Sequence, residues 1–143
     1  MSATTINFTP RGLREFLLCD VKLQGILIWL ATQWPPAELL IGDIHRDAAE
    51  EAAAGGVSGI HMTGPPYRAI DVRVTNLPGD PQVAADAIGA LVNRKYVYDH
   101  ARPDKLVAFT QRHGTGPHVH LQVHQATDFR DRLLSSSFME DKV

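Results

Sequence analysis

Residues 116–124 read GPHVHLQVH, and this stretch decides the fold because apolar and polar side chains alternate along it. In a β-strand, successive side chains point to opposite faces, so Val119, Leu121 and Val123 would share one face. The other face would carry polar side chains, namely His118, His120, Gln122 and His124. The pattern predicts a strand with one core face and one row of imidazoles, with neighbouring imidazoles roughly 7 Å apart and able to serve one metal site.

Length and composition indicate a single domain. The chain has 143 residues, of which 44% are hydrophobic, a normal size for one substantial core. A formal net charge of -2 and the lack of a basic run give no electrostatic reason to expect nucleic acid or an anionic membrane as partner. Seven histidines are the unusual feature of the composition, and the lone Cys19 excludes a disulfide framework and a multi-cysteine zinc finger. We expect a monomer in which Cys19 is a small buried residue.

The N-terminal residues 1–9 do not show a basic segment followed by an apolar one, so they do not resemble a secretory signal. The most apolar stretch, residues 25–30, is too short to cross a bilayer. We expect synthesis in the cytoplasm without membrane insertion. A substrate outside the cell would then require another route of release.

Apolar periodicity and helix-terminating residues predict the other elements. Helices are expected within residues 9–34, where Thr9 and Pro10 form a helix start and a second helix covers residues 21–33. A core is expected over residues 38–124, in the order strand 38–45, helix 47–54, loop 55–66, strand 68–74, turn 76–80, helix 81–95 and strand 106–111. The last of these strands is expected to pair with the strand at residues 116–124 as a hairpin. Residues 128–143 are polar and are expected to form a short helix or a frayed tail.

Two of these elements have a predicted orientation. Strand 68–74 alternates between an apolar face and a polar face that includes Asp71, so we expect it to be buried on one side. Helix 81–95 is expected to turn four apolar residues inward, namely Val83, Ala87, Ile88 and Leu91. The predicted fold is α+β, with a small, mainly antiparallel sheet, helices packed on one side and the polar site on its exposed face.

Three residues on these elements form a candidate metal-binding set: His61 in the loop 55–66, Asp71 on strand 68–74 and His120 on the strand at residues 116–124. Two neutral imidazoles and one carboxylate suit Zn²⁺. Because three protein ligands leave a fourth tetrahedral position for water, the set is typical of a catalytic zinc site. Zinc would lower the pKa of that water and polarise a substrate carbonyl, as hydrolysis of an amide requires.

A general base must lie within hydrogen-bond reach of that water. His118 is the candidate because it shares the polar face with His120 and because no glutamate occurs between Glu51 and Glu140. The chain also lacks an HExxH pair, which excludes a helical zinc site of the thermolysin type.

The segments HMTG at 61–64, RAID at 68–71 and HVH at 118–120 resemble the H-x-x-G-x-A-x-D and H-x-H motifs of a known family. This is the family of zinc D-Ala-D-Ala carboxypeptidases and murein endopeptidases, which shares a zinc-binding fold with the signalling domain of hedgehog proteins and includes many phage endolysins. The resemblance spans about residues 38–123. It implies that His61, Asp71 and His120 bind zinc and that His118 is the catalytic histidine.

The sequence differs from this family pattern in three places. Residues 65–67, Pro-Pro-Tyr, form a three-residue insertion between the first two implied ligands. Gly59 stands where relatives often carry a serine, and Ser58, one place earlier, is the expected substrate-contacting hydroxyl. Many relatives also carry a glutamate where His118 stands, so the role of base follows the branch of the family that uses histidine.

Other polar residues near the motifs are further candidates. Tyr67 and Arg68 would donate hydrogen bonds to a tetrahedral oxyanion, or else Tyr67 packs on the proline pair and Arg68 is solvated. His113, in the loop before the histidine pair, would orient substrate or be merely exposed. The remaining histidines are expected to be non-catalytic: His45, His100 and His124.

These expectations combine into a zinc-dependent peptidase. The resemblance implies a substrate in the peptide stems or crossbridges of bacterial peptidoglycan. A phage or prophage lysin that reaches the cell wall through a membrane lesion fits the sequence, and so does a cytosolic peptidase that acts on imported muropeptides. The alternative is a zinc-stabilised binding or phage structural module that has the same fold without catalysis.

Overall fold

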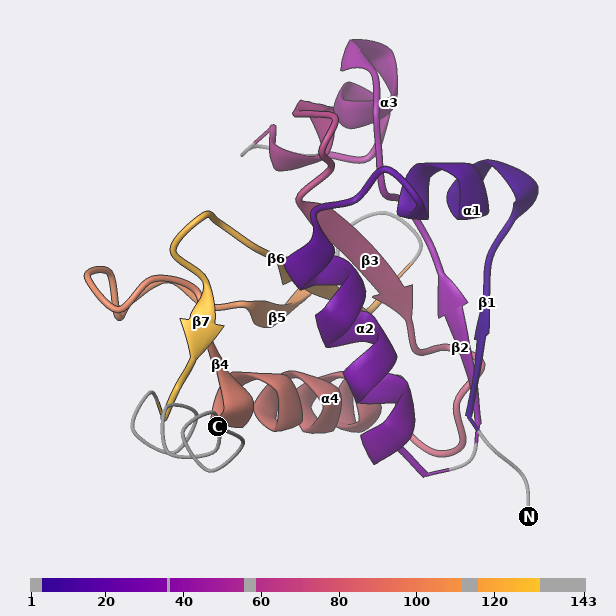
Figure 1. Cartoon of the computed structure of the whole chain (residues 1–143). Helices are drawn as coiled ribbons and strands as arrows, with labels where there is room; N and C mark the ends of the chain where they lie inside the picture. The colour runs from indigo at the N-terminus through magenta and orange to yellow at the C-terminus, as the bar shows by residue number, and fades with distance from the viewer. Residues whose placement is uncertain (1–3, 36, 56–58, 112–115, 132–143) are drawn as a thin grey trace.

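The computed structural model describes residues 4–35, 37–55, 59–111 and 116–131 (Figure 1). Its largest element is a five-stranded sheet with the strand order β1-β2-β3-β6-β5. These strands are β1 Thr5–Asn7, β2 Glu38–Ile41, β3 Ala69–Arg73, β5 Ala108–Gln111 and β6 His118–Gln122. β1 and β2 are parallel, whereas the β2-β3, β3-β6 and β6-β5 pairs are antiparallel. The predicted α+β class with a mainly antiparallel sheet is confirmed.

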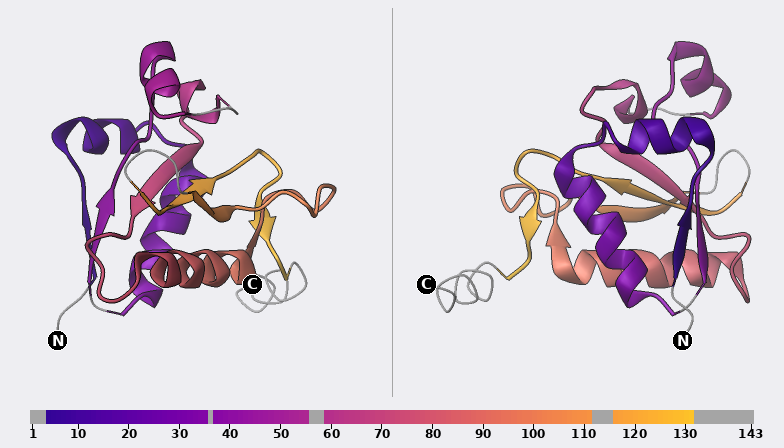
Figure 2. Two further views of the ribbon diagram at one scale, coloured as in Figure 1. Left: turned by 180° about the vertical axis from the view of Figure 1, so that it is seen from behind. Right: turned by 45° about the vertical axis from the view of Figure 1, so that its right-hand side comes forward.

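The helices are α1 Pro10–Phe16, α2 Val21–Gln33, α3 Ala48–Ala53 and α4 Pro81–Lys95, together with the short 3-10 helix η1 Ile60–Met62. α2 and α4 form one hydrophobic core with the sheet, whereas α3 and η1 lie together beyond one end of β3 (Figures 1 and 2). A second sheet pairs β4 Tyr96–Val97 with β7 Asp128–Phe129. The fold thus leaves one face of β3 and β6 to the core, and Arg46 and His61, from the segments around α3 and η1, contact Asp71 on the other face.

Local signals explain the helix bounds. Thr9 caps α1 by accepting a hydrogen bond from the backbone N–H of Gly12 at 2.9 Å, as the Thr9-Pro10 pair predicts. Asp47 and Glu50 form a reciprocal capping box at the start of α3. The bounds of α2 and α4 agree with the predicted helices because caps and prolines act within one turn of the chain.

The core lies between the sheet and the helices α2 and α4. Ile70 and Val72 of β3 are fully buried against it, together with Leu121 of β6. The core face predicted for the strand at residues 116–124, which is β6, is therefore confirmed. Cys19 is also buried, as expected. Full burial of each such aliphatic side chain contributes about 1.5–3 kcal/mol, so this face holds the two strands in one register.

The predicted inward face of α4 is wrong in part. Ile88 is fully buried and Leu91 packs partly against the core, but Val83 is 65% exposed and Ala87 is exposed. The residues that face the sheet are Ala84, Ala85, Ile88, Gly89 and Val92. Three of them are small, Ala84, Ala85 and Gly89, so α4 can lie close to β5 and β6.

The prediction that strand 68–74 is buried on one side is also wrong. Ala69 and Asp71, on the polar face of β3, are 0% and 5% exposed, and only Arg73 at its end is exposed. Side chains from the segment after β2 and from η1 cover this face: Arg46 Nη2 donates to Asp71 Oδ2 at 2.9 Å, and His61 Nε2 lies 3.2 Å from Asp71 Oδ1. The candidate site is therefore enclosed and does not lie on an exposed face of the sheet.

Three other features of the fold differ from the prediction. Strand 38–45 ends at Ile41, because Gly42 and Asp43 both bond to Asp71, and two residues opposite one interrupt the regular ladder. Residues 128–129 form β7 and not a helix or tail, since they pair with β4, while residues 132–143 lie outside the described part of the chain. β1 was not predicted, because its pairing with β2 joins segments about 30 residues apart.

Candidate metal centre

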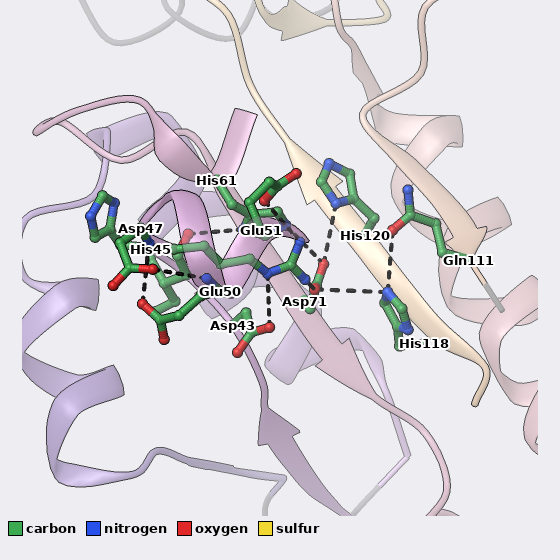
Figure 3. Close-up of polar contacts among 12 residues, drawn as sticks. Asp43, His45, Asp47, Glu50, Glu51, His61, Asp71, Gln111, His118 and His120 are labelled. Carbon is green, nitrogen blue, oxygen red and sulfur yellow. Dashed lines mark hydrogen bonds and ion pairs between the residues drawn. The ribbon is translucent and has the colours of Figure 1, made fainter. Parts of the chain in front are cut away.

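The structure brings His61, Asp71 and His120 together from three separate elements (Figure 3). Asp71 of β3 and His120 of β6 are paired directly across the antiparallel ladder, and η1 carries His61 to the same face. Asp71 Oδ1 lies 3.2 Å from His61 Nε2 and 3.2 Å from His120 Nδ1. The exposed fractions are 4% for His61, 5% for Asp71 and 2% for His120.

In each of the two histidines, one ring nitrogen, the inner one, faces Asp71 and the other, the outer one, points away from it. Both outer nitrogens lie near a carbonyl oxygen. His61 Nδ1 lies 2.9 Å from the backbone oxygen of Ile44. His120 Nε2 lies 3.2 Å from Gln122 Oε1, and Gln122 Nε2 donates to Leu106 O at 2.9 Å, which orients the amide. When the outer nitrogen carries the proton of a neutral ring, the inner nitrogen keeps a lone pair for a metal, whereas in the other tautomer His120 Nδ1 donates to Asp71 Oδ1 at 3.2 Å.

With both outer nitrogens protonated, three electron-rich atoms meet at one buried point. His61 Nε2 has no hydrogen-bond partner among the described residues, although it faces Asp71 Oδ1 at 3.2 Å. Lone pairs so close in a protein interior repel unless a proton or a cation lies between them. The ligand atoms of a tetrahedral zinc site lie roughly 3.3 Å apart when each is about 2.0 Å from the metal. The buried His61-Asp71-His120 group therefore fits a metal ion that would neutralise this repulsion.

Arg46 completes the centre and was missed from the sequence. Its guanidinium, 4% exposed, donates from Nη2 to Asp71 Oδ2 at 2.9 Å, from Nε to Asp43 Oδ2 at 2.9 Å and from Nη1 to Glu51 Oε2 at 3.2 Å. The ion pair with Arg46 occupies Asp71 Oδ2, so Asp71 Oδ1 is the oxygen that faces His61 and His120. The sequence contains a signal for this role: residues 43–51 hold four acidic residues, and Arg46 is the one arginine or lysine among them.

The pKa values within the cluster reflect these contacts. Burial raises the pKa of Asp71, but its interactions with His120 and His61 outweigh burial and hold this pKa well below its ordinary range. Burial lowers the pKa of His61, but the adjacent Asp71 carboxylate outweighs it, so this pKa is raised. Burial also lowers the pKa of Arg46, and its three carboxylate partners reverse the direction. Asp71 is thus ionised at neutral pH.

His118 lies beside this group without belonging to it. Its Nε2 is 3.2 Å from Gln111 Oε1 and 3.7 Å from Asp71 Oδ2, and its Nδ1 is 3.1 Å from Gly116 O (Figure 3). The imidazole is almost fully buried, at 9% exposed. His118 also lines a cleft of about 350 Å³ that reaches Asp71 and Arg46. The His118 ring thus lies between the cleft and the Asp71 carboxylate.

Tyr67 and Arg68 take different positions from one another. Tyr67 is partly buried and stacks on His45, with 4.9 Å between ring centroids, so its packing partner is not the proline pair alone. Arg68 is partly buried, and its backbone oxygen accepts from Val123 N–H at 3.0 Å. Strand alternation groups Arg68 with Ile70 rather than with Asp71. A contribution of Arg68 or Tyr67 to oxyanion binding stays a prediction.

Two predicted substrate contacts, Ser58 and His113, lie outside the described residues. The three histidines expected to be non-catalytic lie away from the ligand group and have local contacts. His124 Nδ1 accepts from Ala126 N–H at 3.2 Å, and His100 Nε2 lies 3.2 Å from Phe129 O. His45 stacks on Tyr67.

The insertion at residues 65–67 does not displace His61 from the ligand group. Tyr67 N–H donates to Leu18 O at 3.1 Å, and Asp20 N–H donates to Tyr67 O at 2.8 Å. The inserted segment is therefore fastened to the turn between α1 and α2. Gly64, with φ of 109°, provides the left-handed backbone that starts it.

Comparisons with known proteins add no family assignment. No protein-family model matches the chain, no curated protein matches its sequence, and no solved structure matches its fold. In the described ranges, no helix has the length and apolar character needed to cross a membrane. The function must therefore be argued from the site itself and from the motifs.

Proposed function

We propose that this protein is a zinc-dependent peptidase that hydrolyses peptide bonds of bacterial peptidoglycan. The observation that carries the proposal is the buried His61-Asp71-His120 group, whose inner nitrogens and carboxylate oxygen converge while their outer partners hold them in place. A second histidine, His118, lies next to this group at the edge of a cleft. This combination of ligands, base and cleft suits a hydrolytic metal site better than an electron-transfer site or a structural metal site.

The residues present suit zinc among the divalent metals. Imidazole and carboxylate ligands suit Zn²⁺, and the carbonyl oxygens beside both outer nitrogens match the usual outer contacts of zinc-bound histidines. When bound by three protein ligands, Zn²⁺ supplies a Lewis acid with one open position for water or a substrate carbonyl. Asp71 would coordinate through Oδ1, because Arg46 already occupies Oδ2.

His118 would act as the proton carrier of the reaction. Its Nε2 lies within 3.7 Å of Asp71 Oδ2, so the imidazole is close to the position where water would be activated. It would accept the proton of the attacking water and return it to the amine that leaves. Gln111 Oε1 and Gly116 O, at 3.2 and 3.1 Å, orient the ring for this exchange.

The choice of peptidoglycan as substrate is supported by the motif resemblance of residues 61–71 and 118–120. In this proposal the protein acts as a monomer on stem or crossbridge peptides and reaches the wall through a phage or prophage lysis system. A peptidase acting on imported muropeptides would use the same site.

One observation favours a second candidate, a zinc-stabilised binding or phage structural module. All three ligand residues are at most 5% exposed, and such enclosure is typical of structural zinc sites. In that case the metal would hold η1 against β3 and β6, and His118 would have only a packing role.

Digestion of purified sacculi, followed by mass spectrometry of the released muropeptides, separates the two candidates. The enzyme predicts one bound zinc per chain and release of peptide fragments, and His118→Ala should abolish release while zinc stays bound. His124→Ala is the matched control, because this histidine follows β6 outside the cluster and should leave release unchanged. Bound zinc without turnover on sacculi or muropeptides would favour the binding module, and lack of stoichiometric metal would contradict both.

A further inference from the structure

The segment at residues 44–46 connects the metal centre with helix α1. On the side of the metal centre, Ile44 O lies 2.9 Å from His61 Nδ1, and the backbone N–H of Arg46 donates to His61 O at 2.9 Å. The Arg46 side chain also donates to Asp71 Oδ2 at 2.9 Å. Two of the three residues of this segment thus contact two of the proposed metal ligands.

The backbone of His45, between these two residues, has its partners in α1. Its carbonyl oxygen accepts from Arg11 Nη2 at 2.9 Å, and its N–H faces Glu15 Oε1 at 3.4 Å. Arg11 and Glu15 are one helical turn apart and contact each other, with 3.0 Å between Arg11 Nε and Glu15 Oε2. The segment is therefore held from two sides, by the metal centre and by α1.

Arg11 also holds the helix that follows this segment. Its guanidinium makes a bidentate contact with Glu50, from Nη1 to Oε2 at 2.7 Å and from Nη2 to Oε1 at 3.0 Å. Glu50 closes the capping box of α3 by accepting from Asp47 N–H at 3.1 Å (Figure 3). The hydrogen bond from Arg11 is the main cause that lowers the pKa of Glu50 to about 2, so the pair is ionised at neutral pH. One side chain thus contacts both the start of α3 and the His45 carbonyl.

These contacts act locally and contribute little to the stability of the whole fold. The side chains of Arg11 and Glu50 are 50% and 40% exposed, and water and salt screen such pairs. Residues 44–46 belong to no helix or strand, so their position depends on contacts of this kind. Loss of the Arg11 contacts should therefore loosen the segment without unfolding the protein.

We propose that Arg11 is a positioning residue of the metal centre, which acts through residues 44–46 on the ligands from η1 and β3. With that segment in place, His61 keeps its carbonyl acceptor and Asp71 keeps its arginine partner. Arg11 lies outside residues 38–123, over which the motif resemblance extends. The inference rests on the metal binding of the proposed function and is independent of the substrate.

The first test measures zinc affinity by competition with a chromophoric chelator. Arg11→Met should weaken zinc binding by about 10-fold, because loss of the outer contacts of metal ligands typically costs about 10- to 100-fold in affinity. Arg14→Met is the matched control, because Arg14 is an exposed arginine of the same helix and carries none of these contacts. Arg11→Lys should recover part of the affinity, since it keeps the charge and loses the bidentate contact. Equal zinc affinities of Arg11→Met and Arg14→Met would overturn the proposal.

Hydrogen exchange of the metal-free protein separates local positioning from a general loss of stability. The Arg46 amide, which donates to His61 O, should exchange about 10-fold faster in Arg11→Met, the factor expected for loss of one charge-assisted hydrogen bond. The amides of Ile26 in α2 and Ile88 in α4 should keep their protection, because the core does not depend on Arg11. Unchanged exchange of the Arg46 amide, or equally faster exchange of all three amides, would overturn the proposal.

Both measurements are made without substrate, so they distinguish failure of this inference from failure of the proposed function. Weaker zinc binding of Arg11→Met than of Arg14→Met, in a protein that releases no peptide from sacculi, would contradict the peptidase and support the role of Arg11. Peptide release by a protein in which the two variants bind zinc equally would support the peptidase and overturn the role of Arg11.

Discussion

His120 Nε2 lies 3.2 Å from the side-chain oxygen of Gln122, on the same face of β6. Gln122 in turn donates from its amide nitrogen to Leu106 O at 2.9 Å, so the direction of the amide is settled by the backbone. This chain of contacts determines which nitrogen of His120 faces Asp71. With its proton on Nε2, His120 would present the lone pair of Nδ1 to a metal.

Gln122→Leu should weaken zinc binding by about 10- to 100-fold, because the His120 ring loses the acceptor that orients it. Competition with a chromophoric chelator of known affinity measures the change. Gln33→Leu, at the exposed C-terminal end of α2, is the control and should bind zinc as wild type does. Equal zinc affinity of the two variants would show that Gln122 does not orient the ring.

Arg46→Met should destabilise the protein by about 3–5 kcal/mol, because it leaves the carboxylates of Asp71 and Glu51 buried without their cation. Their side chains are 7% and 9% exposed, so water screens them little. Urea unfolding of metal-free protein measures the loss. Arg102→Met removes an exposed ion pair and should change the free energy of unfolding by less than about 1 kcal/mol. Similar values for both variants would contradict a structural role of Arg46.

Gly64→Ala should strain the loop that follows His61. A Cβ there would lie 2.6 Å from Pro66 O and 2.7 Å from Tyr67 Cδ1, and the backbone has φ of 109°. Strained backbone of this kind costs about 1–3 kcal/mol, and the clash adds to it. Gly79→Ala is the control for backbone strain alone, because φ is 82° and nothing lies within 4 Å of its Cβ.

Urea unfolding of both glycine variants gives the two free energies, and chelator competition gives their zinc affinities. Gly64→Ala should lose more stability than Gly79→Ala and should also bind zinc more weakly, since the loop holds η1. Losses of equal size would show that the loop around Gly64 has room for a side chain.

Cys19 should make stability depend on pH in the alkaline range. Burial raises the pKa of its thiol to about 12, with smaller contributions from the charges of Glu15 and Asp20. An unfolded chain has a cysteine pKa of about 8.5, so the unfolded state loses its proton first as pH rises. The contribution of the thiol to stability is therefore fully present below about pH 8.5 and is lost as pH rises towards 12.

Urea unfolding between pH 8 and 10 should show wild-type stability falling more steeply than that of Cys19→Ala, by at most about 1.4 kcal/mol per pH unit. Other titrating groups cancel in this comparison. Iodoacetamide at pH 9 should label the native protein far more slowly than the unfolded one. Parallel pH profiles of the two proteins, or fast labelling of native protein, would contradict a buried neutral thiol.

Much of the secondary structure could be predicted from the sequence, because its signals are local. Asp20 and Asp80 cap α2 and α4 through their own neighbours, and both helices have the predicted bounds. Alternation also identified the core face of β6. The inward face of α4 was not predictable in the same way, since Val83 and Ala85 both suit a helix and only packing against β5 and β6 selects between them.

By itself, the sequence determined the residue types that could hold a metal and the strand pattern that places His118 and His120 on one face. Only the tertiary structure decided that His61 reaches Asp71, that Arg46 closes the cluster and that the group is buried. The physical reason is distance along the chain: β3 pairs with β6 about 50 residues away, and η1 joins them through a loop. Periodicity reports the face of a strand, whereas convergence of side chains depends on register and on what covers that face.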